Sequence, residues 1–138
     1  MEVRPIQPGE ARAWARTVTR AFMGKEEPSE EELGFILPTT AIPGTTCFLA
    51  RVDGQDAAGG TVALHDGVAT LSGTGVREAF RGRGLQAALI HARLAFASAQ
   101  GCTLAATATL PATPSQRNME RLGFRIAYPK VVMVREAS

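Results

Sequence analysis

The segment FRGRGLQAAL, Phe80–Leu89, carries two arginines and two glycines and then becomes apolar and helical. This pattern places a turn directly before a helix N-terminus, where backbone N–H groups lack intrahelical acceptors and the helix dipole is positive. Gly82 and Gly84 let the backbone approach an oxyanion closely, and Arg81 and Arg83 add fork-shaped cationic donors. The segment predicts a phosphate or pyrophosphate site, with a purely structural glycine turn as the alternative.

Two common phosphate ligands fit this segment poorly. The spacing Gly82-x-Gly84-x-x-Ala87 matches the dinucleotide-binding fingerprint, but that fold also uses an acid about 20 residues later to bind a ribose hydroxyl. Between Glu78 and Glu120 the chain has no acid at all. It also has no Gly-Lys-Ser/Thr sequence, which an ATP-binding P-loop needs. Nicotinamide, flavin and ATP cofactors are therefore disfavoured.

Local patterns predict four helices and six or seven strands. The helices are expected at residues 11–22, 29–37, 85–100 and 113–123. The strands are expected at residues 2–6, 45–54, 57–67, 68–76, 103–110 and, as one or two strands, 125–136. Capping boxes are expected at Ser29 with Glu32 and at Thr113 with Gln116.

The strand over 68–76 precedes the glycine-arginine segment directly, so its side-chain pattern matters. Its alternation predicts one shared face for Val68, Thr70, Ser72, Thr74 and Val76. Gly73 and Gly75 fall on the other face, where glycines indicate a bulge or the close approach of another backbone.

The order of these elements predicts the architecture. The strand, loop, helix and strand over 68–110 form a crossover unit, so its two strands should be parallel. The other strands are joined by tight turns such as Asp53-Gly54 and Asp66-Gly67 and should be antiparallel. We expect an α/β fold with a mixed, mostly antiparallel sheet of six or seven strands, helices on both faces, and one domain over 1–138.

Charge and composition limit the classes of partner. Residues 1–76 hold ten acids and six bases, whereas residues 77–138 hold three acids and nine bases, for a net charge of +2. The acid-free interval contains Arg81, Arg83, Arg93 and Arg117 and favours an anion. The modest charge and 6% aromatic content argue against nucleic acid. No apolar run approaches the roughly 20 residues that cross a bilayer, so no membrane partner is expected.

The two cysteines, Cys47 and Cys102, lie in apolar, strand-like surroundings. We expect both to be buried reduced thiols, because a disulfide or a metal site would need a richer pattern. No metal is therefore expected. The N-terminus has no signal-peptide core, so a cytoplasmic protein is expected. Trp14, at helical spacing with other apolar residues, is expected in the core.

Two motifs carry a family resemblance. The segment VREAFRGRGLQAALI resembles the acyl-CoA-binding signature Arg/Gln-x-x-Gly-x-Gly/Ala of the GNAT acyltransferase superfamily, with Arg81 first, Gly84 central, and Gln86 departing from the last position. The segment NMERLGF, Asn118–Phe124, is similar to a second family element, Glu-Lys-Leu-Gly-Phe. The order of elements also fits, so the resemblance covers nearly the whole chain.

The resemblance implies positions for an acyl-CoA cosubstrate, most often acetyl-CoA. Backbone N–H groups of the loop would hold its pyrophosphate; the implied residues are Gly82, Arg83, Gly84, Leu85 and Gln86, with the Arg81 side chain nearby. Gly75, Val76 and Arg77 would pair with the pantetheine arm like an added strand, with the Val76 N–H aimed at the thioester carbonyl. Ser115 matches a position that contacts the cofactor, and Asn118 would compensate for an asparagine that Ala112 replaces.

The least typical position is Met119, where many relatives have a tyrosine that protonates the leaving thiolate. Methionine has no proton to donate. Three readings stay open. The acid is dispensable because a thiol of pKa about 8.5 leaves readily; Tyr128 substitutes from a neighbouring strand; or the protein binds acyl-CoA without transferring from it.

The resemblance implies acetyl transfer to an amine by direct attack in a ternary complex. A base must take the amine proton, and His65, Asp66 and Glu78 are candidates near the ends of the central strands. Their alternatives are a strand-end polar residue, a turn residue and a surface partner of an arginine. The acceptor would be a small-molecule or peptide amine, mildly favoured to be cationic by the acid-rich N-terminal half; a homodimer stays open. The rival function is a non-catalytic acyl-CoA-binding sensor or docking module.

Overall fold

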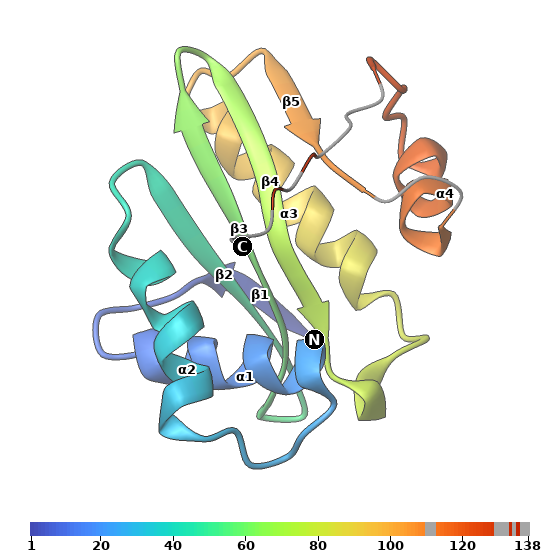
Figure 1. The fold of residues 1–138 in the computed structure, drawn as a ribbon. Coiled ribbons are helices and arrows are strands. Elements are labelled where there is room, and N and C mark those ends of the chain that lie inside the picture. Colours follow the sequence, from blue (N-terminus) through green and yellow to red (C-terminus); the bar gives the residue numbers. More distant parts are fainter. Residues whose placement is uncertain (110–112, 129–132, 134, 136–138) are drawn as a thin grey trace. The chain divides into compact units, whose positions relative to one another are not determined.

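The structure is a computed structural model of the 138-residue chain, and it describes residues 1–109, 113–128, 133 and 135. The described chain divides into two compact units, Met1–Ala108 and Thr109–Ser138. The second unit contains α4, Pro114–Arg121. The first unit contains β1 Glu2–Pro5, α1 Ala11–Met23, α2 Glu30–Ile36, β2 Thr45–Val52, β3 Gln55–His65, β4 Val68–Val76, α3 Leu85–Ala99 and β5 Leu104–Thr107 (Figure 1).

The first unit is built on one mixed sheet of five strands in the order β1-β2-β3-β4-β5. The first three pairings are antiparallel, and β4 pairs with β5 in parallel. The parallel crossover unit over 68–110 is therefore confirmed. The described residues form five strands instead of the expected six or seven, and Arg125–Tyr128 are not in a strand. The rest of the expected strand at 125–136 lies mostly outside the described residues.

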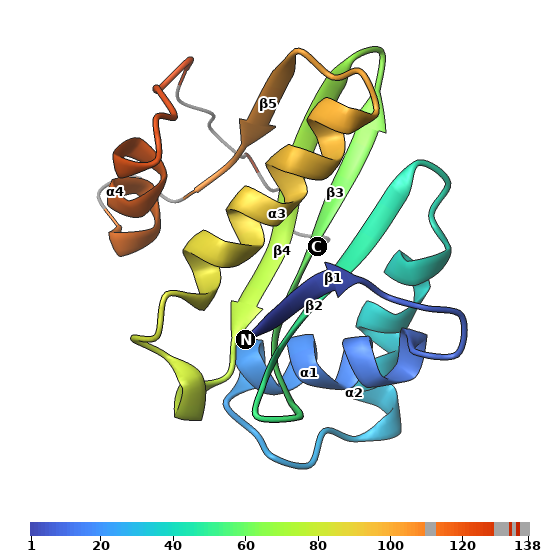
Figure 2. The same cartoon turned by 180° about the vertical axis from the view of Figure 1, so that it is seen from behind.

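Helices cover both faces of this sheet, as Figures 1 and 2 show from opposite sides. Two adjacent glycines of β3 show which helix covers which face of the sheet. A Cβ at Gly59 would lie 2.9 Å from the Trp14 Nε1 of α1, whereas a Cβ at Gly60 would lie 3.0 Å from the Arg93 Nη1 of α3. Because neighbouring strand residues face opposite sides, α1 and α3 pack on opposite faces.

The core on the α1 face is centred on Trp14, which is buried as expected. Its indole Nε1 donates a hydrogen bond of 3.0 Å to the Phe48 carbonyl, so the ring packs without an unpaired polar atom. The cluster consists of Trp14, Ala15, Val18, Leu33, Cys47 and Leu49. On the α3 face, the rings of Phe48 and Phe96 meet edge to face with centroids 5.6 Å apart.

The structure confirms the predicted features that involve only residues close together in the sequence. Ser29 and Glu32 form the reciprocal capping box that opens α2. Asp53 and Asp66 adopt positive φ angles of 51° and 49° before glycines, which completes the two tight turns. Pro38 ends α2 as expected, although the chain continues as a 3₁₀ turn over Leu37–Ala41.

The alternation of β4 is interrupted by a bulge. Ser72 pairs with Thr61 and Gly75 with Gly59, so Gly60 alone opposes Gly73 and Thr74. Gly73 has a φ of +64°, which glycine tolerates. Ser72 Oγ lies 2.9 Å from Thr61 Oγ1, while Thr74 Oγ1 accepts a hydrogen bond from Arg93 on the α3 face. The expected single face for Thr70, Ser72 and Thr74 is therefore wrong, because the bulge reverses the alternation.

A buried arginine holds this bulge in place. Arg93 on α3 is 0% exposed. Its guanidinium donates to the carbonyls of Leu89, Thr61 and Ser72 and to Thr74 Oγ1, with the three shorter bonds at 2.8–3.0 Å. Burial lowers the pKa of Arg93 to about 10, so it remains a cation at neutral pH. Arg93 therefore does not add surface charge for an anion, contrary to its expected role.

We predict that Arg93→Met lowers the free energy of unfolding by about 3 kcal/mol, because three carbonyls and a hydroxyl lose a charged donor. Arg93→Lys should fall between this variant and the wild type, since an ammonium reaches fewer acceptors at once. His91→Met, an exposed position on the same helix, is the control and should change little. Urea denaturation measures all three. Equal stability of Arg93→Met and the wild type would contradict the role of the guanidinium.

The two thiols differ in burial. Cys47 in β2 is buried, and that burial raises its pKa to about 11. Cys102, in the connection from α3 to β5, is only half-buried, so the expectation of two buried thiols holds for Cys47 alone. Both are free cysteines, as expected.

A disulfide reagent at pH 8 should therefore label Cys102 in the native protein and spare Cys47, because thiolate and access are both needed for reaction. Cys102→Ser should abolish the fast labelling phase, and Cys47→Ser should retain it. Mass spectrometry of the labelled peptides identifies the site. Rapid labelling of Cys47 in the folded Cys102→Ser protein would show that the β2 core opens readily.

Candidate functional site

The end of β4 presents an unpaired edge. β5 pairs with β4 only from Val68 to Leu71, and no other described strand lies beside the remaining residues, Ser72–Val76, on that side. A strand edge without a partner offers a row of N–H and C=O groups to an extended ligand. The shortness of β5 therefore creates a place for an added strand.

Val76 directs its backbone groups toward this open edge. Arg77 N donates 2.9 Å to the Ala57 carbonyl of β3, so the N–H groups of Arg77 and Gly75 face β3. Because backbone groups alternate along a strand, the N–H and C=O of Val76 face the opposite side. The Val76 carbonyl indeed accepts a hydrogen bond from Arg81 Nε at 3.1 Å rather than from β3.

Gly75 lets this strand end lie against α1. A Cβ on Gly75 would approach the Ala21 Cβ to 2.8 Å, which real side chains essentially never do. The close approach expected from the glycines of 68–76 therefore occurs at Gly75, while Gly73 supplies the bulge.

The glycine-arginine segment forms an open loop that leads into α3. Gly82 and Gly84 have φ angles of +78° and +77°, and apart from the adjacent residues no atom lies within 4 Å of a Cβ built on either. Gly84 is the N-cap residue of α3 and supplies no side-chain acceptor to the first helical N–H groups. The loop therefore has the open backbone and the helix end that an oxyanion needs.

The arginines of the loop are partly engaged. Arg81 bridges the Val76 carbonyl and, at 3.4 Å, the Ala21 carbonyl of α1, so it ties the loop to the strand end. The guanidinium carbons of Arg77 and Arg83 lie 5.3 and 5.5 Å from the centroid of the Phe80 ring. These contacts hold the cationic side chains beside the loop.

The candidate bases separate into two groups. His65 and Asp66 form the β3–β4 turn, where their side chains are 89% and 87% exposed and 3.1 Å apart. This turn lies at the start of β4, roughly 25 Å from Val76 at about 3.3 Å per strand residue. The expectation that they serve a reaction at Val76 is therefore wrong. Glu78, two residues after Val76, is exposed in the 3₁₀ turn Glu78–Phe80.

The remaining predicted site residues belong to the second unit. Thr113 caps α4 by accepting a hydrogen bond from Gln116 N at 3.2 Å, as its spacing predicts. Ser115 and Asn118 lie in α4, and Met119 is buried. Tyr128 is 74% exposed and does not lie in a strand. Ala112 is outside the described residues.

Sequence reasoning missed two features of the first unit. One is the hydrogen-bond network of Arg93 at the bulge; its only signal in the sequence is that an arginine falls on the inward side of the helix. The other is a row of arginines on α1, Arg12, Arg16 and Arg20, whose spacing of four residues was visible in the sequence. Among the described residues, no cluster of acids, histidines and cysteines is arranged to hold a metal, and no described helix has the length and apolarity to cross a membrane.

Solved structures with the same fold are numerous, and three illustrate their range. The aminoglycoside N-acetyltransferase AAC(6')-Iy, in complex with a CoA bisubstrate analog, is 22% identical with a TM-score of 0.75, over 99% of this chain and 98% of that chain. A ribosomal-protein-alanine N-acetyltransferase from Brucella melitensis biovar Abortus 2308 is 14% identical with a TM-score of 0.78, over 98% and 100%. A transcriptional regulator from Bacillus halodurans C-125 is 18% identical with a TM-score of 0.74, over 97% and 99%.

No curated protein matches the sequence significantly. The family model described as "Acetyltransferase (GNAT) family" matches residues 11–124, which span α1 through α4 and include both motifs of the sequence resemblance. The chain therefore belongs to the GNAT acetyltransferase family.

Proposed function

We propose that the protein is an acyl-CoA-dependent N-acyltransferase that moves acetyl from acetyl-CoA to an amine by direct attack in a ternary complex. The observation that carries this proposal is the continuity of the site. The open edge of β4 at Ser72–Val76 runs directly into the glycine loop at the start of α3. An acyl-CoA molecule would use both features in this order, because its extended pantetheine arm is joined at one end to a pyrophosphate.

The residues present fit such a cosubstrate. The backbone of Gly82–Gln86 is proposed to hold the pyrophosphate, with Arg81 and Arg83 supplying positive charge. Gly75 and Arg77 flank Val76 on the strand that would pair with the pantetheine. Ser115 and Asn118 of α4 are proposed as further contacts. The CoA complexes of AAC(6')-Iy support this choice of cosubstrate.

The chemistry is proposed to rest mainly on positioning and on one backbone donor. The Val76 N–H, directed to the open edge, would donate to the thioester carbonyl as negative charge develops on its oxygen. Glu78 is proposed to take the amine proton, directly or through water. The thiolate is proposed to leave without a side-chain acid, since Met119 has no proton and a thiol of pKa about 8.5 leaves readily. Tyr128 is the alternative acid.

The acceptor is proposed to be a small-molecule or peptide amine. Structural relatives include enzymes named for an aminoglycoside and for a ribosomal protein, so the fold accommodates acceptors of different size. A second candidate function, a non-catalytic acyl-CoA-binding module, is favoured by one observation: the tyrosine position of relatives is occupied by the buried Met119.

The first test is a comparison of melting temperatures with acetyl-CoA, CoA, NADH and ATP. We expect stabilisation by acetyl-CoA and CoA and none by NADH. Gly84→Val should abolish the shift, because a branched side chain at φ +77° strains the loop and covers its N–H groups. Gly101→Val is the matched control, since Gly101, just beyond α3, has a φ of +91° and similar open space.

Both valine variants should lose about 1–2 kcal/mol of stability through strain at positive φ, but only Gly84→Val should lose the acetyl-CoA shift. An unchanged shift in Gly84→Val would show that the loop is not the site. Stabilisation by NADH but not by acetyl-CoA would instead indicate an oxidoreductase.

The second test is release of free thiol from acetyl-CoA in the presence of a panel of amines. Glu78→Gln should lower kcat about 100-fold while keeping the acetyl-CoA thermal shift, because only proton transfer is removed. Tyr128→Phe should keep kcat within about twofold, since the thiolate leaves unaided. A large loss in Tyr128→Phe would assign the acid to Tyr128. Tight acetyl-CoA binding with no turnover on any amine would favour the binding module.

A further inference from the structure

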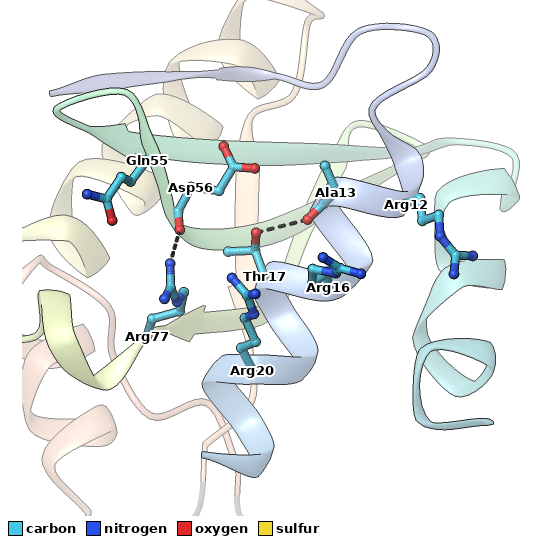
Figure 3. Close-up of a pocket in the computed structure, with 8 residues that line it drawn as sticks. All are labelled: Arg12, Ala13, Arg16, Thr17, Arg20, Gln55, Asp56 and Arg77. Carbon is cyan, nitrogen blue, oxygen red and sulfur yellow. Dashed lines mark hydrogen bonds between the residues drawn. The ribbon is translucent and has the colours of Figure 1, made fainter. Parts of the chain in front are cut away.

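A hollow of about 580 Å³ lies beside α1 in the first unit (Figure 3). Its lining residues are Arg12, Ala13, Arg16, Thr17, Arg20, Gln55, Asp56 and Arg77. They come from α1, from the start of β3 and from the residue after β4, all within Met1–Ala108. None of the loop residues 78–86 lines it.

The lining carries four arginines and one acid. The acid, Asp56, is already engaged, because its Oδ1 accepts a 2.7 Å hydrogen bond from Arg51 Nε. The positive charge of the hollow is therefore largely uncompensated by its own lining. This local sign is opposite to that of residues 1–76 as a whole, which hold ten acids and six bases.

The three arginines of α1 recur every four residues, so they lie along one side of the helix (Figure 3). Like charges at this spacing destabilise a helix by a few tenths of a kcal/mol per pair. The chain offsets part of this repulsion. Arg12 pairs with Glu30 of α2, and Arg20 Nε donates to the Glu26 carbonyl at 2.7 Å. Arg16 is exposed and donates no hydrogen bond to any described residue, although its charge acts on Glu30.

Arg77 lines the hollow with a mostly buried side chain. Its side chain is 12% exposed, donates to the Asp56 carbonyl at 2.8 Å and pairs with Glu26 at 3.1 Å. Its Nε is buried and has no hydrogen-bond partner among the described residues. A buried donor without an acceptor is rare and costly, so it calls for an explanation. The side chain of Glu26, the ion-pair partner of Arg77, is 76% exposed, so water weakens this pair, and an anionic ligand in the hollow would add favourable charge beside Arg77.

We infer that this hollow binds a small ligand with several anionic oxygens, as phosphate or carboxylate groups, through Arg16, Arg20 and Arg77. Guanidinium groups bind both kinds of oxyanion in a bidentate manner, and the volume suits a metabolite-sized molecule. The inference goes beyond the proposed transferase. Arg77 belongs to both sites, with its backbone on the proposed pantetheine strand and its side chain in the hollow. No residue of the loop 78–86 lines the hollow, so oxyanion binding there does not depend on acetyl transfer.

The test uses the full chain and three probes: sodium phosphate, sodium citrate and sodium chloride at equal ionic strength. Phosphate or citrate, at roughly ten times its Kd, should raise the melting temperature by about 4 °C, and chloride should not. A shift with phosphate alone or with citrate alone identifies which oxyanion the hollow prefers. The shift should persist and add to that of CoA when CoA is saturating.

In the variant Arg16→Gln/Arg20→Gln, the apparent affinity for the oxyanion, taken from the concentration dependence of the melting temperature, should fall at least tenfold. The stabilisation by acetyl-CoA should remain. Lys25→Gln/Arg125→Gln is the matched control: it removes the same net charge from residues that do not line the hollow, and it should keep both shifts. Both pairs have exposed or half-exposed side chains, so folding should be retained.

Several results would overturn the inference. They are no shift with either oxyanion, an equal shift with chloride, an unchanged shift in Arg16→Gln/Arg20→Gln, or loss of the shift when CoA is saturating. The last would mean that the anions occupy the acyl-CoA loop instead. Failure of acetyl-CoA to bind, by contrast, would contradict only the proposed transferase and would leave the oxyanion measurement interpretable.

Discussion

The geometry of the site depends on one irregularity in the sheet, the bulge in which Gly60 opposes both Gly73 and Thr74. An extra residue in one strand reverses the side-chain alternation beyond it. In β4 this puts Gly75 against α1, where only glycine fits, and turns the backbone groups of Val76 toward the open edge. A regular strand would leave every later residue with the opposite orientation.

The bulge in turn needs a partner for the backbone groups that it takes out of the ladder. Arg93 provides one from α3, and the helix that carries it is the same helix whose N-terminus follows the glycine loop. The register of β4 and the position of the loop are thereby linked through a single element. Burying the Arg93 cation among carbonyl and hydroxyl groups carries a large desolvation free energy. Its hydrogen bonds to the bulge must offset that free energy.

The sequence was a good guide where structure is decided by near neighbours and a poor one where it is decided across the sheet. The capping box of Ser29 and Glu32 and the two aspartate-glycine turns act within four residues, so their spacing was sufficient. The bulge depends on the pairing of two strands, and the burial of Arg93 depends on which helix face meets the sheet. His65 does lie at a strand end, as its position in the sequence indicates, but this is the end where β4 begins and Val76 lies at the opposite end.

Charge gives the clearest case of this difference. Counting acids and bases along the chain made the N-terminal half look acidic and the C-terminal half basic. In the structure, Arg93 is withdrawn from the basic half by burial, while Arg16, Arg20 and Arg77 line one hollow in the first unit. Electrostatic interactions fall off over about 8–10 Å in physiological salt, so a ligand responds to the side chains around it rather than to the sum over a sequence. The proposed binding of anions at the hollow and at the glycine loop is therefore compatible with a net charge of only +2.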